Sequence, residues 1–121
     1  MDTLYKRITP ERLKELLDRF YAKVFFDSTI SHLFAEDQLP VIKEKQFMFL
    51  SQFLGGPQLY SQEYGHPKMK LRHLPHAITE EAKDEWLRCM RVAIDSMDFE
   101  DGLGDALYNC FPQVASHMVN R

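Results

Sequence analysis

The chain has 121 residues, of which 45% are apolar and 27% charged, and its formal net charge is −3. This length suits one domain with its own core, and the apolar content excludes a disordered tail. The slightly acidic balance argues against a dedicated nucleic-acid binder. Apolar runs fall far short of the roughly 20 residues that span a bilayer, and the start MDTLYKRITPERL has no apolar signal region. We therefore expect a cytoplasmic protein that contacts neither membrane nor nucleic acid.

The first half of the chain predicts two long helices. Thr9-Pro10 is typical of a helix start, with a capping hydroxyl before proline. The apolar stripe that follows repeats at three- and four-residue steps: Leu13, Leu16, Leu17, Phe20, Tyr21, Val24 and Phe25. Asp27-Ser28 ends this helix, and residues 29–34 are expected to form a short helical turn. The second long helix is expected over residues 38–54, ended by Gly55-Gly56-Pro57.

The second half begins with a predicted polar loop over residues 57–67 and a short helix over 68–74 that Pro75 closes. Thr79 is expected to cap a further helix that runs to residue 97. A last helix is expected over residues 103–118, kinked or split by Pro112. Period-two alternation is absent outside loops, so we expect one all-α domain over residues 1–121.

Familiar catalytic and metal motifs are missing from the sequence. Cys89 and Cys110 have no metal-thiolate spacing and are expected to be free thiols, the first of them buried. His73 and His76 stand three residues apart, a spacing that could grip zinc. Pro75 lies between them and no third ligand is spaced nearby, so a zinc site is disfavoured.

Three polar-tipped side chains fall on inward helix faces: Tyr21, Gln46 and Trp86. Each by itself is best read as an ordinary core residue with a backbone partner. Together they indicate a cavity with something polar in it. A core of Phe, Leu and Met with one imidazole and a few convergent donors is what a haem pocket requires.

Several motifs in order carry a resemblance to a known family: Phe20-Tyr21-Ala22, Gly55-Gly56-Pro57, Gly65-His66-Pro67, Arg72-His73-Leu74-Pro75, Trp86 and the closing His117-Met118-Val119-Asn120. From residue 5 to residue 120 the sequence resembles the truncated haemoglobins, and among them group II. The resemblance implies a truncated globin fold, a two-over-two helical sandwich around haem (iron protoporphyrin IX).

The resemblance also implies roles for individual residues. His73 corresponds to the proximal ligand of the iron, and its other N–H is expected to donate to a backbone carbonyl. Arg72 is placed to meet a haem propionate, with a solvated surface charge as the alternative. The remaining implied contacts of the porphyrin are apolar or aromatic: Phe34, Phe49, Leu50, Tyr60, Met69 and Ile78.

Tyr21, Gln46 and Trp86 fall on the family's distal positions. Tyr21 and Trp86 are expected to donate hydrogen bonds to the bound ligand, and Gln46 to orient Tyr21 or to act through water. A hydrogen bond to a charged acceptor contributes roughly 1.5–3 kcal/mol, so two donors slow ligand release by roughly 10²–10⁴. The expectation is tight oxygen binding with slow release at a pentacoordinate iron.

The sequence departs from the family at four positions. Ile8 is followed by Thr9-Pro10 where members carry a glycine pair, so the first turn is expected to differ. His76 replaces a phenylalanine and is expected to lie at the surface or to contact a propionate, with competition for the iron as the alternative. Ile42 is bulkier than the usual residue at the distal gate. Pro112 falls inside the last helix.

Three classes of function stay open. The first is a haem protein that binds oxygen, and also NO or CO, as carrier, store or sensor. The second is a haem enzyme, either a nitric oxide dioxygenase that needs a separate reductase or a weak peroxidase. The third is a helical interaction protein without cofactor, which would be colourless when purified. The sequence leaves the choice between monomer and homodimer open.

Overall fold

The computed structural model describes residues 2–65 and 77–120, which form α-helices, two 3₁₀ helices and no strand. The elements in chain order are α1 (Leu4–Ile8), α2 (Pro10–Phe26), η1 (Ser31–Leu33), η2 (Glu36–Gln38), α3 (Leu39–Phe53), α4 (Leu59–Tyr64), α6 (Glu80–Ser96), α7 (Leu103–Tyr108) and α8 (Pro112–His117). The all-α prediction is confirmed for these ranges. None of their helices is long and apolar enough to cross a membrane.

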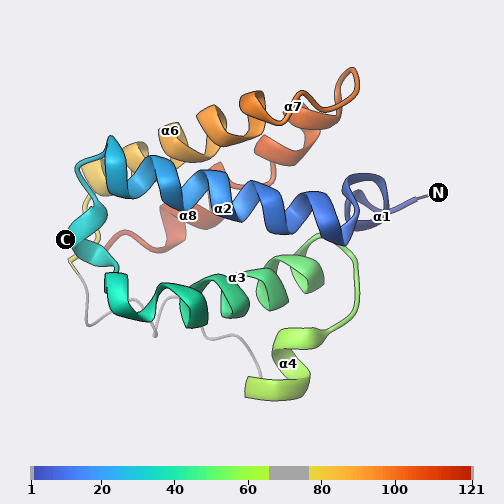
Figure 1. The fold of residues 1–121 in the computed structure, drawn as a ribbon, viewed down its shortest axis with the longest axis horizontal. Coiled ribbons are helices and arrows are strands. Elements are labelled where there is room, and N and C mark those ends of the chain that lie inside the picture. Colours follow the sequence, from blue (N-terminus) through green and yellow to red (C-terminus); the bar gives the residue numbers. More distant parts are fainter. Residues whose placement is uncertain (1, 66–76, 121) are drawn as a thin grey trace.

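The three long helices, α2, α3 and α6, pack through α2, which agrees with the two-over-two sandwich that the resemblance implies. Helix α2 packs along α6 on one side and against α3 on the other, and Figure 1 shows it between them. Helix α6 also contacts α7 and α8, while α4 packs on α3. The buried core lies where α2, α3 and α6 meet.

Helix α2 forms as its sequence pattern predicted. The Thr9 hydroxyl accepts a hydrogen bond from Arg12 N at 3.4 Å, and Pro10 occupies the first turn. The apolar stripe is buried, with Leu16, Phe20 and Val24 fully enclosed. The turn before α2 does hold a strained residue, because Thr9 has φ 77° and ψ 148°, a region that favours glycine.

Two helices lie where none was predicted. Helix α4 lies inside the predicted loop 57–67, so that prediction was wrong. Ser61 N donates to the Gln52 side chain at 3.0 Å, and Gln52 Nε2 donates back to Ser61 Oγ at 2.8 Å. Helix α1 docks through a bond from Tyr5 N to the Leu54 carbonyl at 3.0 Å. Both helices depend on contacts between segments, which a local pattern does not contain.

Two predictions for the second half of the chain are confirmed, and a third lies outside the described residues. Thr79 caps α6 by accepting from Ala82 N at 3.0 Å, as expected. The predicted last helix is split into α7 and α8, with Pro112 at the start of α8, which confirms the break at this proline. The helix predicted over residues 68–74 lies outside the described residues.

Candidate functional site

A cavity opens between α3, α6, α8 and the connection that joins α2 to α3. Counted with its mouth, it has a volume of about 990 Å³. Its lining consists mainly of apolar and aromatic side chains: Ile30, Leu33, Phe34, Gln46, Phe49, Leu50, Phe53, Ile78, Ala82, Lys83, Trp86, Phe111, Val114, Ala115 and Met118. Hollows with such walls and a few polar groups are typical of sites for organic ligands and cofactors.

Many of the side chains proposed from the sequence come together at this cavity. The following proposed residues line it: Phe34, Gln46, Phe49, Leu50, Ile78 and Trp86. Tyr60 is buried behind the lining, with its ring edge-on to Phe49 at a centroid distance of 5.9 Å. Met69, Arg72 and His73 lie outside the described residues, as does His76.

Tyr21 is also one layer behind the lining. Its ring is 1% exposed and packs edge-on against Phe34, with the centroids 5.4 Å apart. Its hydroxyl donates to Gln46 Oε1 at 3.5 Å, the long limit of a hydrogen bond. Burial raises the pKa of Tyr21, so the hydroxyl stays protonated and remains a donor at physiological pH.

Trp86 presents its indole to the cavity from α6. Its ring is held between Phe20 and Phe111, at centroid distances of 5.1 Å and 5.6 Å. No hydrogen bond joins its N–H to another residue of the described part of the chain. The site thus combines one indole donor, one carboxamide and one lysine with walls that are otherwise apolar.

The sequence interpretation overlooked part of the lining. Lys83 precedes Trp86 by three residues, so the two side chains share one face of α6, and this spacing could have revealed it. Its Nζ lies 2.9 Å from Glu80 Oε2 and 3.4 Å from Asp84 Oδ1. The bond to Glu80 raises the pKa of Lys83, so the ammonium at the cavity wall is charged.

Further overlooked lining residues lie on α3 and at the end of the chain. Phe53 follows Phe49 by four residues on α3, while Val114, Ala115 and Met118 share one face at the end of the chain. Ile42, proposed as a distal gate, is half-buried against the core and is absent from the described lining.

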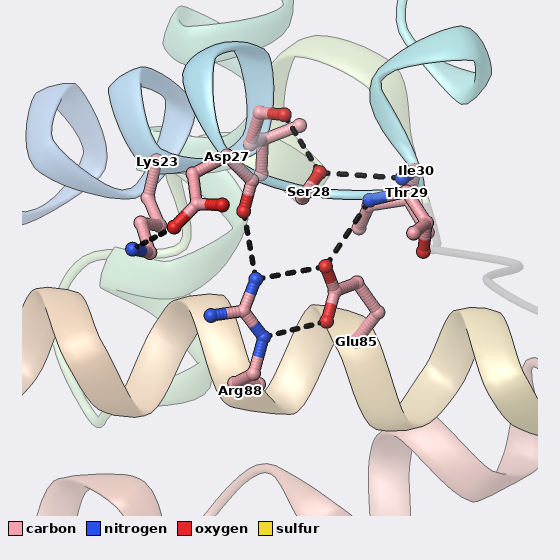
Figure 2. A network of polar contacts seen from close by, with 8 residues as sticks. Lys23, Asp27, Ser28, Thr29, Ile30, Glu85 and Arg88 are labelled. Carbon is pink, nitrogen blue, oxygen red and sulfur yellow. Dashed lines mark hydrogen bonds and ion pairs between the residues drawn. The ribbon is translucent and has the colours of Figure 1, made fainter.

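A network of polar contacts holds the segment that follows α2 (Figure 2). This segment carries Ile30, which lines the cavity. Glu85 on α6 accepts two bonds from Arg88, at 2.6 and 2.8 Å, and a third from Thr29 N at 3.1 Å. Arg88 also donates to the Asp27 carbonyl at 2.7 Å. The Arg88 guanidinium holds the pKa of Glu85 at about 2, so this carboxylate stays ionised.

The residues present fit haem better than a bare metal ion. Among residues 2–65 and 77–120, no cluster of three or more His, Cys, Asp or Glu side chains could hold an ion. The cavity instead has the apolar walls that a porphyrin face needs.

Cys89 is a buried free thiol, as expected, and Cys110 is a half-buried one; burial raises the pKa of both.

Comparisons with known proteins agree with this fit. The family model described as bacterial-like globin matches residues 3–120. A group 2 truncated haemoglobin of Bacillus subtilis, YjbI, is 41% identical over 117 residues, which cover 97% of this chain and 88% of the relative.

Solved structures show the same likeness in three dimensions. The truncated oxygen-avid haemoglobin of Bacillus subtilis superposes with a TM-score of 0.91 at 39% identity, covering 98% of this chain and 100% of that one. The group II truncated haemoglobin of Bacillus anthracis superposes with a TM-score of 0.92 at 36% identity, covering 99% and 92% of the two chains.

Proposed function

The chain belongs to the bacterial-like globin family, and within it to the group 2 truncated haemoglobins, whose cofactor is haem; from this premise we propose that residues 1–121 form one globin domain that binds oxygen tightly and releases it slowly. The observation that carries the proposal is the cavity, an apolar hollow with Trp86 and Gln46 among its lining. Haem would be held between the apolar walls of this cavity, and its iron would supply the site that binds a diatomic ligand.

His73 is the proposed imidazole, and Arg72 the proposed partner of a propionate. The other histidines of the described residues support a pentacoordinate iron. His32 and His117 are both exposed, and neither belongs to the described cavity lining. The proposed walls are Phe34, Phe49, Leu50 and Ile78, with Tyr60 behind them. Met69, outside the described residues, is proposed as a further wall residue.

The chain's polar groups account for slow release. The Trp86 indole N–H has no hydrogen-bond partner among the described residues and can donate to a ligand in the cavity, where low polarity strengthens a hydrogen bond. The Tyr21 hydroxyl donates to Gln46 Oε1 and so orients the carboxamide. The Gln46 amide N–H₂ is then the second proposed donor, with Tyr21 acting through it.

The oxygen-avid haemoglobin of Bacillus subtilis, similar over nearly its whole length, supports the same ligand for this chain. NO and CO are proposed as further diatomic ligands. Nitric oxide dioxygenation is the alternative activity and requires a separate reductase. Peroxidase activity is expected to be weak, because the described lining holds no histidine or carboxylate that could move a proton across a peroxide.

A visible spectrum of the purified protein tests the proposal. The wild type is expected to show a Soret band that His73→Ala loses, because the iron then lacks its protein ligand. His117→Ala is the matched control, an exposed histidine at the end of α8, and is expected to keep the band. A colourless wild type would overturn the proposal and favour a helical interaction protein without cofactor.

A further inference from the structure

The end of the chain is joined to the start of α6 by two backbone-directed hydrogen bonds. Ile78 N donates to Asn120 Oδ1 at 3.0 Å, and Asn120 N donates to the Ile78 carbonyl at 2.8 Å. We call this pair of bonds the Asn120 clasp. It closes over 42 residues of sequence, so it is a tertiary contact and not part of a helix.

The clasp lies at the edge of the cavity. Ile78 lines the cavity from one side of the clasp, and Met118, two residues before Asn120, lines it from the other. Thr79, next to Ile78, caps α6 and so fixes the start of the helix that carries Trp86. The clasp therefore joins two wall segments that the chain connects only through α6, α7 and α8.

Nothing in the local sequence would hold this end of the chain in place. Helix α8 has six residues, too few to be stable without tertiary contacts, and residues after a last helix tend to fray. The Asn120 carboxamide provides an acceptor for Ile78 N, while the Asn120 backbone N–H makes the second bond.

We propose that Asn120 is a positioning residue for the cofactor: the Asn120 clasp keeps the walls formed by Ile78 and Met118 together and thereby slows the loss of haem. This inference rests on the proposed function, because it assumes that the cavity holds haem. Asn120 does not belong to the described cavity lining and acts through Ile78.

Three variants of the haem-loaded protein test the proposal. Asn120→Ala removes the acceptor for Ile78 N and leaves the backbone bond. Asn120→Asp keeps an acceptor oxygen. Asn109→Ala removes the same carboxamide from an exposed position at the end of α7 and is the matched control. The readouts are hydrogen exchange at the Ile78 amide, haem transfer to an excess of an apoglobin acceptor, and the Tm.

The Ile78 amide is expected to exchange faster in Asn120→Ala, and haem loss to accelerate about 2- to 10-fold, as the loss of one hydrogen bond predicts. Asn120→Asp is expected to restore both values. A purely structural role would instead lower the Tm and leave haem loss unchanged.

Several results would overturn the inference. Equal haem loss in Asn120→Ala and Asn109→Ala would show that the clasp does not retain the cofactor. Unchanged exchange at Ile78 would show that the bond is not formed, and failure of Asn120→Asp to restore retention would show that the acceptor is not what matters. A wild type without a Soret band would remove the proposed function together with this inference.

Discussion

The hydroxyl of Tyr21 on α2 and the carboxamide of Gln46 on α3 meet behind the cavity wall, 3.5 Å apart. The Tyr21 hydroxyl thus donates its hydrogen bond to a neighbouring side chain, whereas Trp86 on α6 lines the cavity directly. This arrangement ranks the two donors, which the sequence alone treated as equals.

Trp86→Phe is therefore expected to speed oxygen release more than Tyr21→Phe. Loss of a donor to a charged acceptor corresponds to roughly 1.5–3 kcal/mol, or about 10- to 150-fold in rate. Tyr21→Phe acts only through Gln46, so its effect is expected to stay below about tenfold. Stopped-flow release measures both, with the Soret band confirming equal haem content. A larger effect of Tyr21→Phe would contradict the ranking.

Glu85→Gln is expected to change how stability depends on pH. The folded-state pKa of Glu85 is about 2, below its ordinary value of 4.5, so its ionised form stabilises the fold above pH 4.5. That contribution is lost as the pH falls from 4.5 towards 2. The difference in urea stability between wild type and Glu85→Gln should thus be constant from pH 7 to 5 and shrink below pH 4.5.

The matched control for this pH series is Glu81→Gln, a change at an exposed carboxylate of the same helix that does not bind Arg88. A Glu85→Gln difference that grows in acid would contradict the sign derived from the ion pair.

Thr9→Gly is expected to stabilise the protein. A β-branched residue at φ 77° is strained by about 1–3 kcal/mol, and glycine relieves this strain. Glycine caps almost as well as threonine but adds entropy to the unfolded chain, so the net gain is about 0.5–1 kcal/mol. Thermal unfolding should show a Tm higher by about 2–4 °C.

Thr79→Gly is the matched control, because Thr79 also caps a helix but has φ −91°. It carries no such strain, so the same substitution there is expected to lower the Tm. A loss of stability at both threonines would show that the turn at Thr9 is not strained.

Gly56→Ala is expected to destabilise the protein by about 1–3 kcal/mol, as overpacking does. A Cβ on Gly56 would lie 2.6 Å from the Tyr5 ring and 2.8 Å from the Ser51 carbonyl oxygen, so α1 must shift. Gly104→Ala is the control, since its nearest contact is an Ile94 methyl at 3.2 Å. Urea unfolding of the two variants should separate them, and an equal effect would show that α1 does not depend on Gly56.

The long helices could be predicted because their signals are local. The cap at Thr9, the stripe through Phe20 and the break at Pro112 each act within a few residues, and the structure has the helix boundaries they indicate. The positions of α1 and α4 could not be predicted, since Tyr5 bonds to the Leu54 carbonyl and Gln52 to Ser61 only after the chain has folded.

In the candidate site, too, some features could be predicted from the sequence and others depend on how the helices pack. Tyr21, Gln46 and Trp86 could be selected from the sequence, because a polar-tipped side chain on an apolar helix face is visible in the helical period. Their positions relative to the cavity differ because α2, α3 and α6 cross at distances that no single helix encodes, which leaves Trp86 at the cavity and Tyr21 behind it.

The sequence by itself determined that this chain is helical, where its long helices begin and end, and which family it resembles, since these follow from periodicity, caps and motifs within short stretches. Only the tertiary structure decided that Lys83 and Phe111 share a wall with Trp86, and that Asn120 meets Ile78. Such contacts join residues far apart in the chain, and their geometry exists only once the helices have packed.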